Sequence, residues 1–224
     1  MTPEWVRLPI GWIANHRLRE FKWINSGPGA NEVAALMTLV AIAHCADQET
    51  GRARLTYDEL TKRTCLSRAK VSAGLKVLQD RKLITRRADG HRSDVALANY
   101  DPNLGWAKLP MKGMYAAGRI RAFDEFTLRR PVELDAMKLF FLFAERRDRA
   151  SNVANISYDG IETYTGVART KIKSAHSLLA ALSMVYVEST ISAQSEFGVA
   201  NAYRIVGVES RLHRGTRARW ELET

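Results

Sequence analysis

Basic side chains at the start of two matching segments are the groups in this chain with the clearest chemistry. Arg68 and Lys70 follow Ser67, and Arg169 and Lys171 stand in a similar segment 101 residues further along. Guanidinium and ammonium groups donate hydrogen bonds to phosphate oxygens and to O6 and N7 of guanine. Both segments therefore predict surfaces that bind a polyanion.

The match between these segments belongs to a repeat with a constant offset of 101 residues. Three stretches carry it: Trp5–Pro9 with Trp106–Pro110, Leu55–Leu60 with Ile156–Ile161, and Thr64–Val71 with Thr165–Ile172. A repeat of this length indicates a duplicated domain, because solenoid units repeat every 20 to 50 residues or so. We expect domain 1 at residues 1–101, domain 2 at 102–210 and a basic C-terminal arm at 211–224.

The charge of the chain is positive in both halves. The formal net charge is +10 and the sequence pI is about 9.9. Residues 1–101 contain 16 Lys and Arg against 11 Asp and Glu, and residues 102–224 contain 18 against 13. Such a surface attracts phosphates, although a basic surface can also be merely solvated.

Cysteines and apolar segments indicate the compartment. Cys45 and Cys65 are the two cysteines and form neither a disulfide framework nor a metal-ligand set. We therefore expect a reducing, cytoplasmic location and no metal or cofactor. The start of the chain does not read as a secretion signal, and the most apolar window, residues 33–46, is too short to cross a bilayer. No membrane contact is expected.

Capping signals and apolar spacing predict the helices of the first unit. A long helix is expected from Asn31, after an extended Trp5–Pro9 and an amphipathic segment at 10–23. Thr56 and Glu59 form a capping box before a short helix that ends near residue 64. Ser67 then caps a second helix over 68–82, with an inner stripe of valine and leucine at 71, 75 and 78.

A hairpin is expected after these helices. Its strands lie near residues 83–87 and 94–100, joined by a turn at 88–93. The second unit repeats the order, with a long helix over 131–144, two short helices at 157–165 and 168–183, and strands at 185–190 and 201–206. Gly166 replaces Cys65 at the turn between the short helices and suits a left-handed conformation there.

These residues carry a family resemblance. Leu55-Thr-Tyr-Asp-Glu-Leu60, Leu66-Ser-Arg-Ala-Lys-Val71, Leu75-Lys-Val-Leu78 and Leu83-Ile84 resemble the core of winged-helix DNA-binding proteins, in which Leu-Ser-x-x-x-Val opens the recognition helix. The whole chain is similar to plasmid replication initiators and to phage or plasmid regulators. The resemblance implies a mainly α fold with small β-hairpins (α+β), two tandem winged-helix (helix-turn-helix) domains, and sequence-specific binding of double-stranded DNA in plasmid replication or transcription regulation.

In a winged helix, the recognition helix enters the major groove and the hairpin, or wing, contacts phosphates. We expect recognition helices at 68–82 and 169–183 and a DNA-contacting wing at 84–100. The candidate contacts are Ser67, Arg68, Lys70, Ser72, Lys76, Arg86, Arg87, His91 and Arg92 in the first unit, and Arg169, Thr170, Lys171, Lys173 and Ser174 in the second. Ser67 is expected to hold a phosphate together with free backbone amides.

The two wings differ in charge. Residues 81–92 carry a local charge of +4, with His91 at the tip, whereas residues 184–206 carry −1. We therefore expect the first unit to be the better DNA reader, because a basic wing neutralises phosphates. The second wing is apolar and either forms a homodimer or other subunit contact or completes the sheet; its apolar residues are Val185, Val187, Ile191, Phe197 and Val199.

Other residues receive plainer interpretations. His176 lies on the inward stripe of its helix and is expected to be a core or boundary residue, and Trp5 and Trp106 are expected to plug the cores. The basic segment 211–219 is either a flexible tail or an arm that binds phosphate. No catalytic motif is recognisable, so an enzyme is not expected. The remaining alternative is a protein-interaction scaffold in replication or partition that uses the second winged helix.

Overall fold

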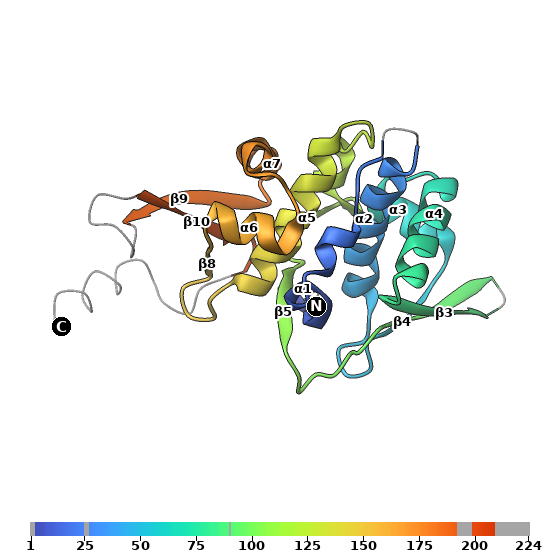
Figure 1. Ribbon diagram of the computed structural model, residues 1–224. Coiled ribbons are helices and arrows are strands. Elements are labelled where there is room, and N and C mark those ends of the chain that lie inside the picture. Colours follow the sequence, from blue (N-terminus) through green and yellow to red (C-terminus); the bar gives the residue numbers. More distant parts are fainter. Residues whose placement is uncertain (1–2, 25–26, 90, 192–198, 209–224) are drawn as a thin grey trace.

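Two long helices form the centre of the molecule and each carries a small sheet and further helices (Figure 1). The computed structural model describes residues 3–24, 27–89, 91–191 and 199–208. Its helices are α1 (Gly11–Ala14), η1 (Arg17–Glu20), α2 (Gly29–Cys45), α3 (Tyr57–Thr64), α4 (Arg68–Asp80), η2 (Arg121–Glu125), α5 (Pro131–Arg146), α6 (Tyr158–Thr165) and α7 (Arg169–Ala181). The α+β class expected from the sequence is confirmed.

The strands form four small antiparallel sheets. They are β1 (Trp5–Pro9), β2 (Arg52–Leu55), β3 (Ile84–Asp89), β4 (Arg92–Leu97), β5 (Trp106–Pro110), β6 (Tyr115–Ala116), β7 (Arg119–Ile120), β8 (Val153–Asn155), β9 (Val185–Ile191) and β10 (Val199–Ile205). The sheet orders are β2-β4-β3 in the first half and β8-β10-β9 in the second, while β1 pairs with β5 and β6 with β7. Each half thus has a long helix, a strand, two short helices and a hairpin, in that order.

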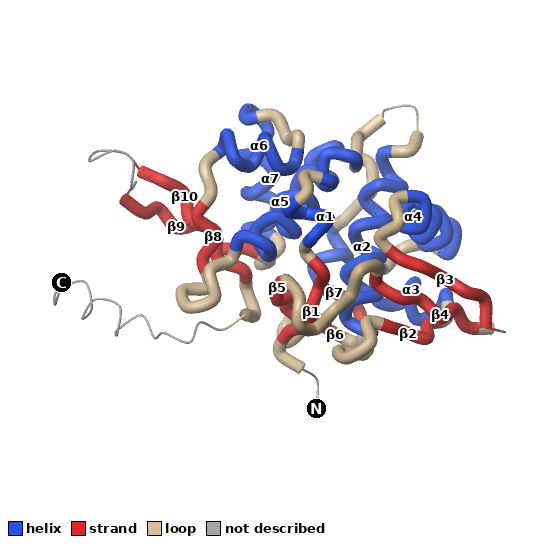
Figure 2. The backbone as a smooth tube through the Cα atoms, turned by 60° about the horizontal axis from the view of Figure 1, so that its bottom comes forward, coloured by secondary structure: helices blue, strands red, loops and turns tan. Residues whose placement is uncertain are grey.

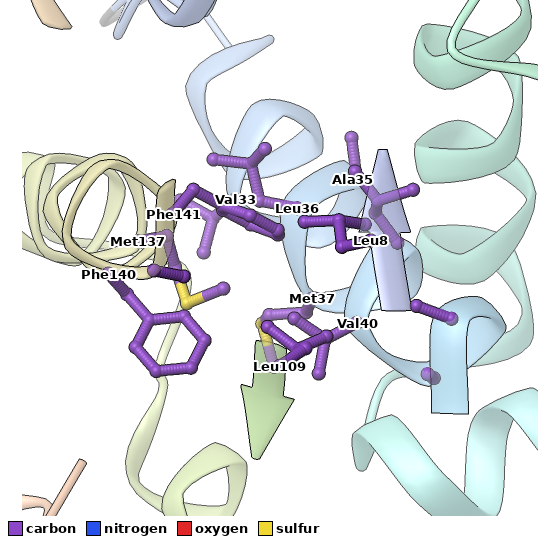
Figure 3. Close-up of a cluster of buried hydrophobic side chains, with 14 of the residues drawn as sticks. Leu8, Val33, Ala35, Leu36, Met37, Val40, Leu109, Met137, Phe140 and Phe141 are labelled. Carbon is purple, nitrogen blue, oxygen red and sulfur yellow. The ribbon is translucent and has the colours of Figure 1, made fainter. Parts of the chain in front are cut away.

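The core lies where α2 and α5 pack against each other. Both helices are buried on nearly every side, and their packed side chains include Leu36, Met37, Met137, Phe140 and Phe141 (Figure 3). Helices that are mainly apolar and buried on nearly every side lie in the middle of a protein. One continuous set of buried side chains therefore serves both halves.

The two short helices of the first half begin and end as the sequence predicts. Thr56 and Glu59 form the reciprocal capping box, and the Ser67 hydroxyl accepts a hydrogen bond from the amide of residue 70. The turn between the helices is left-handed in both halves, at Cys65 (φ 60°) and at Gly166 (φ 68°). Cysteine thus adopts here the conformation for which glycine is better suited.

Several predicted boundaries were wrong. α2 begins at Gly29 after Pro28, ahead of the expected Asn31 cap, because proline suits the start of a helix. Residues 10–23 are not one amphipathic segment, since left-handed His16 separates α1 from η1. α4 stops at Asp80, and the first hairpin has a shorter turn than expected because its strands reach residues 89 and 92.

Strands from the two halves pair with each other. β1 and β5 run antiparallel with Trp5 opposite residue 110 and Pro9 opposite residue 106. Val6, Leu8, Ala107 and Leu109 point into the core, while the two tryptophans are only partly buried. The prediction that Trp5 and Trp106 plug the two cores was therefore wrong, because their strand register turns them to the outer face of the ribbon.

Contacts between the halves are reciprocal. Trp5 and Trp106 stack with ring centroids 5.2 Å apart. The Arg7 guanidinium lies 5.4 Å from the Trp106 ring centroid, and the equivalent Lys108 ammonium lies 4.4 Å from the Trp5 ring centroid. Equivalent residues therefore exchange partners across the β1–β5 ribbon.

The N-terminal segment of each half also lies on the other half. The His16 ring stacks on the ring of Tyr164 in α6 at 4.2 Å, and the end of the Lys62 side chain of α3 lies close to Gly118. The Trp12 ring meets the Phe141 ring of α5 edge-on at 5.5 Å. Neither half buries its core without the other.

The two hairpins extend from opposite ends of the molecule. β3 and β4 project at one end, beside α4, and β9 and β10 project at the other (Figures 1 and 2). The two hairpins therefore belong to different ends of a centre built on α2 and α5.

Candidate nucleic-acid interface

The first turn of α4 presents two basic side chains, Arg68 and Lys70, that differ in exposure. Arg68 is exposed, and its Nη1 lies 3.2 Å from Oδ1 of Asp58, which is itself highly exposed. The Lys70 ammonium donates to Oδ1 of Asn31 in α2 at 3.0 Å and is partly buried. An exposed ion pair contributes little and exchanges readily, so Arg68 is the more available of the two for a ligand.

Three other predicted residues of the first unit surround this turn. The Ser67 hydroxyl is occupied as the helix cap. Ser72 is exposed one turn further along, and Lys76 pairs with Asp80 at 3.2 Å on the outer face. The inner stripe is buried as expected, so the basic residues lie on the solvent side of α4.

The hairpin of the first half continues this basic surface. The Arg86 Nε donates to the Ser93 hydroxyl at 2.9 Å, which fixes one end of its guanidinium group. Arg87 and Arg92 are exposed, as is His91 between the two strands. Among the described residues, no Asp or Glu lies within ion-pair distance of the arginines at positions 86, 87 and 92.

Two arginines that the sequence analysis did not single out explain why the hairpin arginines have no carboxylate within ion-pair distance. Arg52 and Arg54 of β2 form ion pairs with Asp94 and Asp89, the two acidic residues of the hairpin. The neighbouring strand thus neutralises the hairpin's own carboxylates. Strand pairing over about forty residues leaves no local pattern in the sequence, so this arrangement could not be predicted.

Tyr57, the first residue of α3, is the second omission. The Arg68 and Arg86 guanidinium carbons lie 4.8 Å and 5.1 Å from its ring centroid. Burial raises the pKa of Tyr57, but hydrogen bonds from Ser72 and Arg86 and the charges of both arginines lower it below its usual value. Tyr57 therefore joins α3, the recognition-helix candidate α4 and the hairpin in one cluster.

The second half presents a smaller basic surface. Arg169 forms an ion pair with Asp159, at the positions equivalent to Arg68 and Asp58. Thr170, Lys171, Lys173 and Ser174 are all exposed on α7, and the Ser174 hydroxyl donates to a carbonyl of its own helix. Ala168 gives α7 no side-chain cap.

The second hairpin differs from the first, as its sequence charge indicated. Arg204 pairs with Glu188 at 3.0 Å and is thereby neutralised. Val185 is buried and Val187 partly buried, whereas Tyr186 is 55% exposed. The side chains of Ile191, Phe197 and Val199 and the arm at 211–224 lie outside the described residues.

His176 lies at the boundary of the second core, as expected. Its Nε2 is 3.2 Å from the Tyr158 hydroxyl, and Asn201 approaches the same hydroxyl at 3.4 Å. Burial and the nearby Lys173 lower the pKa of His176. Tyr158, the equivalent of Tyr57, thus has neutral partners.

The comparisons with known proteins add no family. No protein-family model matches the chain, and no curated protein matches it significantly. Within the described part of the chain, no helix has the length and apolarity needed to cross a membrane. In the same residues, no group of three or more His, Cys, Asp or Glu side chains is arranged to hold a metal ion.

Proposed function

We propose that the protein binds double-stranded DNA sequence-specifically through two winged-helix units related by an internal duplication. The observation that carries this proposal is the surface of α4 and the β3–β4 hairpin, where, among the described residues, no Asp or Glu lies within ion-pair distance of Arg86, Arg87 or Arg92. A helix with a basic first turn beside a basic hairpin fits a major groove flanked by phosphates.

Equivalent hydrogen bonds in the two halves support the duplication. The Thr64 hydroxyl donates to the Leu60 carbonyl as the Thr165 hydroxyl donates to the Ile161 carbonyl. The loops before β2 and β8 also match, because Asp47 accepts from Thr50 as Asp148 accepts from residue 151. Both pairs of contacts keep the offset of 101 residues found in the sequence.

Reciprocal contacts across the β1–β5 ribbon support an approximate two-fold relation between the units. In a two-fold pair, residue i contacts residue j and j contacts i in return, as the Trp5, Arg7, Trp106 and Lys108 contacts do. Two such units present their recognition helices to half-sites of opposite orientation, about one helical turn or a multiple of it apart. The expected target is therefore an inverted repeat.

The biological setting we propose is plasmid or phage replication initiation or transcription regulation in the cytoplasm. An inverted repeat at a promoter favours regulation, whereas repeated sites at an origin favour initiation. Selection of duplexes by the full-length chain from a random pool tests the proposal. The proposal predicts that the selected duplexes share a motif with two inverted half-sites. A pool that shows no enrichment after repeated rounds contradicts the proposal.

A second candidate function concerns the second unit alone. Its hairpin has its described arginine neutralised and exposes an aromatic ring at Tyr186. Exposed aromatic side chains are enriched in protein interfaces. The unit would then act as a homodimer contact or as a scaffold in replication or partition. Sedimentation of the full-length chain and of Tyr186→Ser tests this: a dimer that the substitution dissociates supports it, and a monomer contradicts the homodimer.

A further inference from the structure

Tyr57 occupies the point where three elements of the first unit meet. It is the first residue of α3, directly after the Thr56 cap, and the guanidinium groups of Arg68 in α4 and Arg86 in β3 both lie against its ring. The residue is only partly buried, so part of its side chain is open to solvent beside the basic surface. None of the sequence patterns indicated a role for it.

The Tyr57 hydroxyl has polar neighbours from α4 and from the hairpin. The side chains of Ser72 and Arg86 lower the pKa of Tyr57, which places both of them beside its hydroxyl. A phenolic hydroxyl can donate its own proton to an acceptor. The acceptor that fits next to two guanidinium groups is an anionic oxygen, because charge-assisted hydrogen bonds are the strong ones.

The charge around the cluster also favours an anion. Arg86 has no carboxylate within ion-pair distance among the described residues, and its Nε is held by Ser93. Arg68 has a highly exposed partner, Asp58, that a ligand can displace. A single phosphodiester group can therefore contact Tyr57, Ser72, Arg68 and Arg86 without displacing a buried carboxylate from either arginine.

We propose that Tyr57, together with Ser72 and Arg86, binds one phosphate of the DNA backbone, so that α4 and the hairpin are fixed on the same phosphate. This inference rests on the proposed DNA binding and adds a contact that belongs to the first unit alone. Arg68 lies over the ring of Tyr57 and reaches the same phosphate from the side of the recognition helix.

The second unit provides an internal comparison. Tyr158 stands at the equivalent position, but its hydroxyl meets His176 and Asn201, and valine and lysine replace Arg86 and Ser72 at positions 187 and 173. Its hydroxyl therefore has neutral partners instead of a second arginine. Loss of the Tyr158 hydroxyl should not weaken DNA binding directly.

The test compares Tyr57→Phe with Tyr158→Phe in the full-length chain, on a duplex selected by the wild-type protein. Each substitution removes one oxygen and keeps the ring. Tyr57→Phe should weaken binding about tenfold, as expected for a hydrogen bond to a charged group. Because no charge is removed, the slope of log K against log salt should stay unchanged, and Tyr158→Phe should bind like the wild type.

A duplex series with one methylphosphonate at a time locates the contacted phosphate. At one position, the neutral linkage should weaken the wild type and abolish the difference between wild type and Tyr57→Phe. Ser72→Ala should lose affinity with the same positional dependence. Equal affinity of wild type and Tyr57→Phe for the unmodified duplex would overturn the inference while leaving DNA binding intact.

A difference between Tyr57→Phe and wild type that persists at every methylphosphonate position would also overturn it, since the hydroxyl would then act without a phosphate contact. If the wild-type chain selects no duplex at all, the proposed function itself fails and this inference fails with it. Thermal unfolding of both phenylalanine variants checks that the fold is retained.

Discussion

Trp5 and Trp106 stack on each other with an interplanar angle of 11°, although 101 residues separate them. Each ring also makes a cation–π contact with a basic side chain of the opposite strand: Lys108 of β5 lies over Trp5, and Arg7 of β1 lies over Trp106. The pair lies on the outer face of the β1–β5 ribbon, where equivalent residues of the two halves meet. It therefore marks the place about which the halves are arranged.

Replacing either tryptophan should loosen this ribbon. Trp5→Ala and Trp106→Ala should each lower the free energy of unfolding by about 1 to 2 kcal/mol, because a half-exposed aromatic pair and its cation contact are lost. The double variant should lose less than the sum, by about 1 kcal/mol, since the first substitution already removes the stack. Urea unfolding of the four proteins measures this; strict additivity would contradict a direct Trp5–Trp106 interaction.

The first half, produced without the second half, should not fold into a stable structure. A fragment of residues 1–101 exposes the side chains that pack on the second half, including Trp12, Val6 and Leu8. We expect it to aggregate or to lack a cooperative thermal transition, because its part of the shared core is left open to water. Circular dichroism melting checks the outcome, and a monomeric fragment with a sharp transition would show that the halves are independent.

Stability should fall on mild acidification because of His44. Burial lowers the pKa of His44 to about 3, while its ring nitrogens lie 2.8 Å from the Tyr115 hydroxyl and 2.9 Å from the Pro110 carbonyl oxygen. The unfolded chain takes up a proton near pH 6.5 that the folded chain does not. Between pH 7.5 and pH 5 this linkage removes about 2 kcal/mol of stability.

The control for this pH effect is His44→Gln, which cannot titrate. Its stability should be lower at pH 7.5, because a polar contact between the halves changes, but it should depend less on pH over the same window. Urea midpoints at pH 7.5, 6.5 and 5 provide the comparison. Parallel pH profiles for the two proteins would mean that His44 is protonated to the same extent when folded and unfolded.

The two hairpins should respond differently to charge removal. Arg87 has no acidic partner among the described residues, so Arg87→Gln should reduce the magnitude of the salt slope of DNA binding by about 0.9, the value for one phosphate. Arg204 is neutralised by Glu188, so Arg204→Gln should leave the slope as it is. An unchanged slope in Arg87→Gln would remove the first hairpin from the DNA interface.

The sequence predicts the local structure of each half better than the relation between them. The capping box at Thr56, the Ser67 cap and the buried stripe of α4 are written in neighbouring residues and were found as expected. The pairing of β1 with β5 depends on a register between distant strands, and nothing near Trp5 or Trp106 encodes it.

The residues of the candidate site also divide into those that the local sequence indicates and those that only the fold brings together. Arg68, Arg86 and Arg87 could be chosen from local charge alone. Tyr57 could not, because its importance comes from Arg68 and Arg86 approaching it from two other elements. A tyrosine at the matching positions 57 and 158 of the two halves was a visible signal, but the different surroundings of the two rings appear only in the folded chain.

Footprinting a selected duplex with the wild-type chain, Arg68→Glu and Arg169→Glu tests the central claim most directly. The two substitutions reverse equivalent charges, and each breaks an equivalent exposed ion pair. We expect two protected patches about one helical turn apart or a multiple of it, with Arg68→Glu losing one patch and most of the affinity and Arg169→Glu losing the other patch. Footprints and affinities that both variants share with the wild type would contradict DNA reading by α4 and α7.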